Sequence, residues 1–217
     1  SELVDMSPES LQDTIKVYLR RYDILSLKRL IRWKESGEKE NIQELMTPVG
    51  SYSYGELKEL SEKSFEETIE SIRFKDSEID YSEYLKGKSD SSKIETALDQ
   101  AYFDELSKLA EKTRSKDLEK FIQTEMEYQN IKIALRLKKY GISEEKIRER
   151  LLKIDNGKTV EKVVDAENLE AALEVVKDGG LLTDRASESL ENIEHEMEVK
   201  RLSEALSSFH QAPMGIT

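Results

Sequence analysis

Apolar residues recur along most of the chain with the three- and four-residue spacing that marks one face of a helix. The first run follows Ser7-Pro8, where Ser can cap a helix and Pro fits its first position. Its apolar positions are Leu11, Ile15, Tyr18, Leu19, Tyr22, Leu27, Leu30 and Ile31. The spacing predicts one long helix over residues 8–35, with a kink near Asp23.

Shorter helices are predicted between this long helix and the middle of the chain. One covers residues 41–46. Two more begin where Ser53 precedes Glu56 and where Ser64 precedes Glu67, because a Ser three residues before a Glu has the spacing of a capping box.

The helical spacing resumes after a polar stretch at residues 86–93, which we interpret as a linker. The resumed face consists of Ile94, Ala97, Leu98, Ala101 and Tyr102. A second long helix is predicted over residues 118–140. Further helices should begin at Ser143 and Asp165, whose side chains can cap, and a last helix is predicted over residues 183–209.

One helix pattern occurs twice, at residues 22–34 and again at 126–138, with a constant offset of 104 residues. The identical pairs are Lys28 with Lys132, Arg32 with Arg136, and Lys34 with Lys138. After each copy come a Gly, a short acidic helix and a second Gly, namely Gly37 and Gly50, then Gly141 and Gly157. This shared order predicts an internal duplication into two helical units, at a period too long for a solenoid repeat.

Asp23 lies beside the apolar stripe of the first long helix, because apolar residues stand four and seven positions further on. A charge in such a place needs a partner. We therefore expect Asp23 and the matching Glu127, together with Arg32 and Arg136, to form buried or half-buried polar contacts that fix how helices cross. The alternative is that these acids reach water at the edge of the stripe.

Composition supports an all-α fold with long helices. Only three Pro and nine Gly interrupt the chain, and strand-like alternation is nearly absent. The formal net charge of −12 would repel the phosphate backbone of a nucleic acid and an anionic lipid surface, so we expect neither as a partner. The regular apolar spacing argues against disorder, which is the other interpretation of a charged fraction of 37%.

The chain has no Cys, which is the usual state of proteins in a reducing cytosol. It also has no apolar run of about 18 residues and no signal-peptide pattern at its start. We therefore expect a cytoplasmic protein without a membrane span. The first residue is Ser1 rather than Met, which we interpret as processing or a chosen boundary.

No residue pattern predicts a catalytic, cofactor-binding or metal site. The two histidines, His195 and His210, fit better as solvated helix residues than as metal ligands, which need several convergent groups. The stretch KGKS at residues 86–89 lacks the upstream Gly and the strand of a phosphate-binding loop. Trp33 and the tyrosines follow helical spacing and are expected to pack between helices. An enzyme remains an alternative that a buried titratable cluster in a pocket would favour.

The repeated pattern resembles the signature helix of the C subunit of the A-type (archaeal, V-type-like) ATP synthase, a family related to the d subunit of the vacuolar ATPase. The resemblance rests on Tyr-Asp-x-x-x-Leu-Lys-x-Leu-x-Arg-x-Lys at residues 22–34 and on its second copy at 126–138. Residues 97–103, ALDQAYF, and 47–50, TPVG, are similar to two further segments of the family. The candidate signature residues are Asp23, Lys28, Arg32, Lys34, Asp99, Tyr102, Glu127, Asn130, Lys132, Arg136 and Lys138.

The resemblance implies three helical units around a pseudo-threefold axis, whereas this chain carries the signature helix twice. It places a first unit at residues 1–90, a second at 91–180 and the start of an incomplete third at 181–217. The family's opening segment is nearly absent, and residues 212–215, APMG, resemble the lead-in to a third copy. We therefore expect a form of the family protein that is truncated at both ends.

The same resemblance implies a non-catalytic member of the central stalk. Such a protein sits on the cytoplasmic face of the membrane proteolipid ring, receives the foot of the central stalk, and transmits torque for proton or sodium transport. The implied partners are the ring and the central-stalk subunits, with no small-molecule substrate and no cofactor. Weak self-association is expected if one unit is missing. The alternative is a generic helical adaptor unrelated to rotary ATPases, which would form a superhelical stack instead of quasi-equivalent units.

Overall fold

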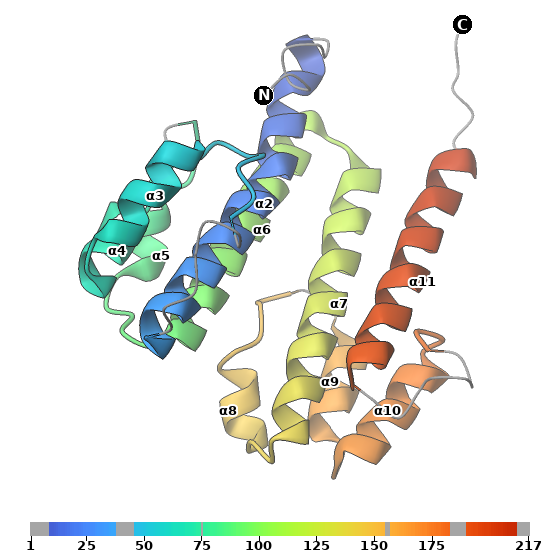
Figure 1. Cartoon of the computed structure of the whole chain (residues 1–217). Helices are drawn as coiled ribbons and strands as arrows, with labels where there is room; N and C mark the ends of the chain where they lie inside the picture. Colours follow the sequence, from blue (N-terminus) through green and yellow to red (C-terminus); the bar gives the residue numbers. More distant parts are fainter. Residues whose placement is uncertain (1–8, 38–45, 75, 155–156, 183–189, 212–217) are drawn as a thin grey trace, which may run out of the picture. The chain divides into compact units, whose positions relative to one another are not determined.

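The computed structural model describes residues 9–37, 46–74, 76–154, 157–182 and 190–211, and every regular element in these ranges is an α-helix (Figure 1). The predicted all-α fold is therefore confirmed. Within the same ranges, no helix is long and apolar enough to cross a membrane.

Among the described residues, four helices are long and six are short. The long ones are α2 (Glu9–Ser36), α6 (Ser91–Thr113), α7 (Lys116–Lys139) and α11 (Leu190–Gln211). The short ones are α3 (Tyr54–Glu62), α4 (Phe65–Ser71), α5 (Tyr81–Leu85), α8 (Glu144–Arg148), α9 (Lys158–Asp165) and α10 (Leu169–Asp178). The short helices lie between the long ones along the chain, so each half contains long helices braced by short ones.

Both predicted signature helices are confirmed, as α2 and as α7. The chain is helical without interruption through Asp23, near which we expected a kink. Part of the last predicted helix is confirmed as α11, which the structure describes from Leu190. Residues 41–45 of the predicted helix at 41–46 lie outside the described residues, and Met46 is not helical. The helix starts at Ser7-Pro8 and residue 183 also lie outside the described residues.

Capping side chains begin several of the short helices. The two predicted capping boxes are confirmed at Ser53 and Ser64, each of which accepts a hydrogen bond from the backbone of the Glu three residues on. Ser143 stands at the start of α8 as predicted, but there its carbonyl, rather than its side chain, accepts the bond from Ile147. Because each cap satisfies a backbone group that a helix end leaves open, it fixes where the helix begins.

The predicted cap at Asp165 is wrong. Asp165 is the last residue of α9, and Ala166, with a ψ of 137°, bends the chain out of the helix before the next one begins. Asn168 begins α10 instead, because its Oδ1 accepts a hydrogen bond from the Ala171 N–H at 2.9 Å. The polar linker predicted at residues 86–93 is also shorter than expected, since α6 already starts at Ser91.

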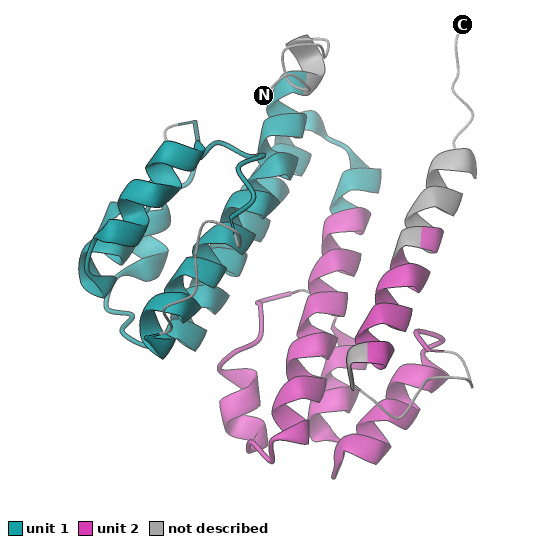
Figure 2. Cartoon of the chain, viewed as in Figure 1, with its two compact units in different colours: residues 1–119 teal, residues 120–217 magenta. Residues whose placement is uncertain are grey.

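The chain forms two compact units, residues 1–119 and residues 120–217 (Figure 2). In the first, α2 packs along α6, and α3, α4 and α5 complete the unit. The second contains most of α7 together with α8 to α11. The predicted boundaries at residues 90 and 180 mark repeats in the sequence rather than compact units, and they stay a prediction.

The core of the first unit lies between α2, α6 and the short helices. Its fully buried apolar side chains include Leu27, Leu30, Ile31, Leu57, Ile72, Ile94, Leu98 and Ala101. The core of the second unit contains Tyr128, Ile131, Ala134, Leu135, Ile147, Val160, Val163, Val164, Ala172, Val176, Leu182, Ile193 and Met197. Burial of these side chains is the main force that holds each unit together.

Candidate functional site

Ion pairs join the two long helices of the first unit. Lys28 Nζ on α2 lies 2.6 Å from Asp99 Oδ2 on α6, and both side chains are largely buried. One turn further along α2, Arg32 pairs with Glu95, which lies one turn earlier on α6. The helices are therefore antiparallel here, and the structure brings together two of the predicted residues, Lys28 and Asp99.

The second unit repeats this arrangement between α7 and α11. Arg136, which matches Arg32 at the offset of 104 residues, pairs with Glu194 on α11 through two hydrogen bonds. Lys132, which matches Lys28, is half-buried near Glu194 and Glu198; burial lowers its pKa, and these two carboxylates oppose that effect. A further pair, Arg201 with Glu125, joins the same two helices. In both units a basic stretch of the signature helix faces acids on its long partner.

Lys34 and Lys138 hold the C-terminal end of a short helix in each unit. Lys34 Nζ donates to the carbonyl of Ser61 at 3.0 Å and to that of Lys63, at the end of α3. Lys138 Nζ donates to the carbonyl of Ala166, at the end of α9. The last carbonyls of a helix lack partners within it, so a cation at this position stabilises the end.

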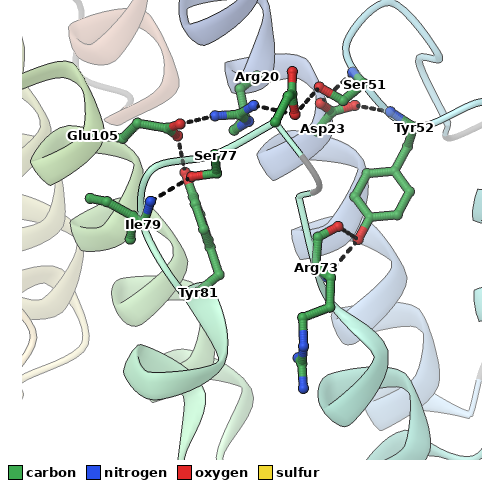
Figure 3. A network of polar contacts seen from close by, with 10 residues as sticks. Arg20, Asp23, Ser51, Tyr52, Arg73, Ser77, Ile79, Tyr81 and Glu105 are labelled. Atoms are coloured by element: carbon green, nitrogen blue, oxygen red, sulfur yellow. Dashed lines mark hydrogen bonds and ion pairs between the residues drawn. The ribbon is translucent and has the colours of Figure 1, made fainter. Parts of the chain in front are cut away.

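Asp23 binds the loop before α3. It is fully buried, and its carboxylate accepts hydrogen bonds from the Ser51 N–H at 2.7 Å and the Tyr52 N–H at 3.1 Å (Figure 3). Burial raises the pKa of Asp23 to about 6, while the two N–H groups pull that pKa down. Gly50 makes this approach possible, because a Cβ there would lie 2.2 Å from Asp23 Oδ2.

Asp23 therefore forms a buried polar contact as expected, but with loop backbone, so this contact holds a loop rather than the crossing of two helices. The matching Glu127 in the second unit is only half-buried. Asn130 instead holds the corresponding loop, since its amide donates to the Leu152 carbonyl at 2.9 Å and accepts from the Leu152 N–H at 2.7 Å. Tyr102, the remaining candidate, is buried on α6 with its ring centroid 5.3 Å from that of Phe103.

A buried charged cluster centred on Arg20 was not predicted from the sequence. The Arg20 guanidinium donates to Glu105 on α6 and to Asp76 at 2.7 Å, and it lies 4.9 Å from the ring centroid of Phe74. Tyr81 donates to the other Glu105 oxygen at 2.9 Å (Figure 3). The available signal was helical spacing, because Arg20 precedes the buried Ile24 and Leu27 by four and seven residues.

This cluster is the arrangement that could favour an enzyme, but its charged groups are engaged with one another, although the buried Arg20 Nε has no hydrogen-bond partner. Both oxygens of Glu105 accept bonds, one from Arg20 and one from Tyr81. Burial alone would lower the pKa of Arg20, yet the hydrogen bond and charge of Glu105 raise it. Burial and the Glu105 charge raise the pKa of Tyr81. Near neutral pH the guanidinium stays charged and the phenol stays neutral, which suits an ion pair that holds helices together.

A small pocket of about 110 Å³ opens beside the cluster, lined by Asp13, Lys16, Glu105, Lys112 and their neighbours. Among the residues that the structure describes, no group of three or more His, Cys, Asp or Glu side chains is arranged to hold a metal ion. Of the two histidines, His195 is exposed on α11, and the side chain of His210 lies outside the described part of the chain.

Comparison with known proteins gives a consistent match. The chain matches the family described as ATP synthase (C/AC39) subunit over residues 1–217. It is 35% identical to the C subunit of the A-type ATP synthase of Methanococcoides burtonii over 159 residues, which cover 70% of this chain and 43% of the relative. The corresponding protein of Methanosarcina barkeri, which has the same name, is 33% identical, with 65% of this chain and 40% of the relative covered.

A more distant relative is the C subunit of the A-type ATP synthase of Methanocaldococcus jannaschii, 31% identical over 65% of this chain and 37% of the relative. The chain therefore spans less than half the length of the curated relatives it matches.

Proposed function

The chain belongs to the family of ATP synthase (C/AC39) subunits, and from this premise we propose that it is a non-catalytic central-stalk subunit of an A/V-type rotary ATP synthase. In this role it links the central stalk to the membrane proteolipid ring and transmits torque for proton or sodium transport. Its place is at the cytoplasmic face of the membrane, as a peripheral part of the complex. Family membership weighs against a helical adaptor unrelated to rotary ATPases.

The observation that supports a mechanical role is the bracing of the long helices. A part that transmits torque must resist sliding and bending of its helices under load. In each unit, a largely buried ion pair joins the signature helix to a long helix, Lys28–Asp99 in the first and Glu125–Arg201 in the second. The more exposed pairs Arg32–Glu95 and Arg136–Glu194 join the same helices. A partly buried ion pair with fixed geometry restrains both sliding and rotation of one helix on another.

The experiment is a pull-down of purified proteolipid ring and, separately, of central-stalk subunits by the tagged chain. The full-length Methanococcoides burtonii relative serves as the reference. We expect the chain to retain both components. If the reference retains them and the chain retains neither, the assignment fails for this chain.

We also propose weak self-association. Its support is the exposure of Tyr140 at 76% and Val199 at 52% in the second unit. Light scattering at increasing concentration should show a rising average mass, and a constant monomer mass would contradict it.

A further inference from the structure

The face of α2 that points away from its core carries a row of large side chains. Tyr18 and Leu25 are each 41% exposed, and Tyr22 and Trp33 are half-buried. With the exposed Arg29, these residues follow one another at intervals of three or four, so they form one line along the helix. We call Tyr18, Tyr22, Leu25, Arg29 and Trp33 the outer stripe.

The composition of the outer stripe is that of a protein interface. Tyr, Trp and Arg are enriched where proteins bind one another, and they contribute most of the binding energy there. Arg21 flanks the stripe, with its guanidinium 5.6 Å from the Tyr18 ring centroid and 6.0 Å from that of Tyr22, and it donates to the Tyr18 hydroxyl at 3.1 Å. These contacts hold the aromatic rings in place before any partner arrives, which lowers the entropic cost of binding.

The second copy of the repeat uses the same helix face for packing. At the offset of 104 residues, Tyr18 matches Ile122 and Tyr22 matches Met126, which are only 1% and 3% exposed. Trp33 matches Leu137, which packs against the core of the second unit. At the two remaining positions, Leu25 matches Gln129 and Arg29 matches Ile133, which are half-buried. The face is therefore more buried in the second copy, whereas the first copy keeps Tyr18 and Leu25 exposed, as expected of a face adapted to being covered.

The charges beside the outer stripe indicate what kind of partner covers this face. Most of the basic residues of α2 are engaged within the first unit: Arg20, Lys28 and Arg32 pair with acids, and Lys34 donates to carbonyls at the end of α3. Arg21 and Arg29 lie beside or on the outer stripe, within a chain whose net charge is −12. The chain already shows how such a helix is covered, because the basic side of each signature helix lies against acids of a long helix. Arg21 and Arg29 extend the positive charge of α2 to the outer stripe.

We propose that the outer stripe is a docking site for an acidic, amphipathic helix of another polypeptide. Its apolar residues lie on Tyr18, Tyr22, Leu25 and Trp33, and its carboxylates lie beside Arg21 and Arg29. Complementary charge sets which partner binds and in which register. This surface goes beyond the proposed function, since it depends on neither the ring nor the central stalk as the source of the helix.

The test places a photo-crosslinking phenylalanine at position 25 of the chain, in the cells from which it derives, and identifies the attached peptide by mass spectrometry. The same amino acid at position 54 is the control, because Tyr54 is a similarly exposed residue of the same unit. We expect position 25 alone to capture a net-negative amphipathic segment of a different polypeptide. In this background, Arg29→Glu should lower the yield at least about tenfold, and Lys58→Glu, an equal charge change on α3, should not.

The proposal is overturned if position 25 captures a second copy of this chain, lipid, or a segment without net negative charge. It is equally overturned if the yield does not exceed that from position 54, or if Arg29→Glu has no effect. Arg29→Gln, which only removes the charge, serves as the second variant if Arg29→Glu fails to fold. Capture of an acidic helix from a protein outside an ATP synthase would support the docking site and contradict the proposed function, so the two claims fail separately.

Discussion

At the scale of single residues, Asp23 and Gly50 depend on each other. The buried carboxylate reaches two backbone N–H groups only because residue 50 has no side chain. This one contact connects the middle of α2 to the start of α3, across more than twenty intervening residues, and it sets the path of the loop.

Gly50→Ala should destabilise the first unit by about 2–4 kcal/mol, because the new Cβ would overlap the Asp23 carboxylate and displace it from its donors. The measurement is chemical unfolding followed by circular dichroism. Gly55→Ala is the matched control, since a Cβ there would lie 4.0 Å from its nearest neighbour, Ser53 Oγ, and it should be neutral or stabilising by up to about 1 kcal/mol. Equal stability of the two variants would contradict this account of Gly50.

Asp23 should also give the protein a distinctive pH dependence. Because burial raises its pKa from 3.8 to about 6, the folded state holds this proton more tightly than the unfolded state does. The contribution of Asp23 to stability is therefore fully present below about pH 4 and falls as pH rises through 6, by up to about 3 kcal/mol.

The check is the difference in unfolding free energy between the wild type and Asp23→Asn, measured from pH 4 to pH 7. Other carboxylates titrate in both proteins and cancel in this difference. We expect the unfolding free energy of the wild type to fall relative to that of Asp23→Asn as pH rises. A difference that stays constant or grows in favour of the wild type would show that the Asp23 carboxylate is not penalised by burial.

At the scale of elements, the ion pairs between the long helices differ in burial and therefore in strength. The Arg20–Glu105 pair is buried on both sides. By contrast, the side chains of Arg32 and Arg136 are 59% and 54% exposed in their pairs with Glu95 and Glu194. Water screens the exposed pairs, so they contribute less.

Arg20→Ala should destabilise the protein by about 3–5 kcal/mol, because it leaves Glu105 buried without its cation. Arg20→Met combined with Glu105→Leu and Tyr81→Phe should be more stable than Arg20→Met alone, since no buried polar group of this cluster then lacks a partner.

Arg32→Ala and Arg136→Ala should each lower the unfolding free energy by only about 1 kcal/mol or less, seen as a small fall in melting temperature. An unchanged melting temperature in both Arg32→Ala and Arg136→Ala would refute a structural role for those two residues.

The elements themselves were largely predictable from local sequence, because helical periodicity and capping boxes act over a few residues. That is why α2, α7 and the caps at Ser53 and Ser64 agree with the prediction. Local sequence does not distinguish Asp165 from Asn168 as a cap, because Asp and Asn both suit that position; only the backbone bend at Ala166 selects Asn168.

The contacts between elements were less predictable, because a residue's helix face does not reveal which distant segment covers it. Asp23 was correctly placed beside the apolar stripe, yet its partners lie in a loop that the periodicity does not position. The burial of Arg20 does not follow from local sequence, because an Arg on a charged helix is usually solvated and its partner Glu105 is 85 residues away.

At the scale of the whole molecule, the two units share a way of joining helices. In each, a basic signature helix faces an acidic long helix, and a Lys near its end holds the last carbonyls of a short helix. The residues that make these matched contacts are the identical residues of the two sequence copies, Arg32 with Arg136 and Lys34 with Lys138. We interpret them as the bracing that a torque-transmitting protein requires.

The most direct test of this function is an electron cryomicroscopy map of the A/V-type rotary ATP synthase purified from the cells that produce this chain. We predict density for the α2–α6 pair between the foot of the central stalk and the cytoplasmic face of the proteolipid ring. Density for the chain on a peripheral stalk or on the ATP-binding head would contradict the proposed function. So would a complex that keeps its ring and central stalk but has no density for the chain.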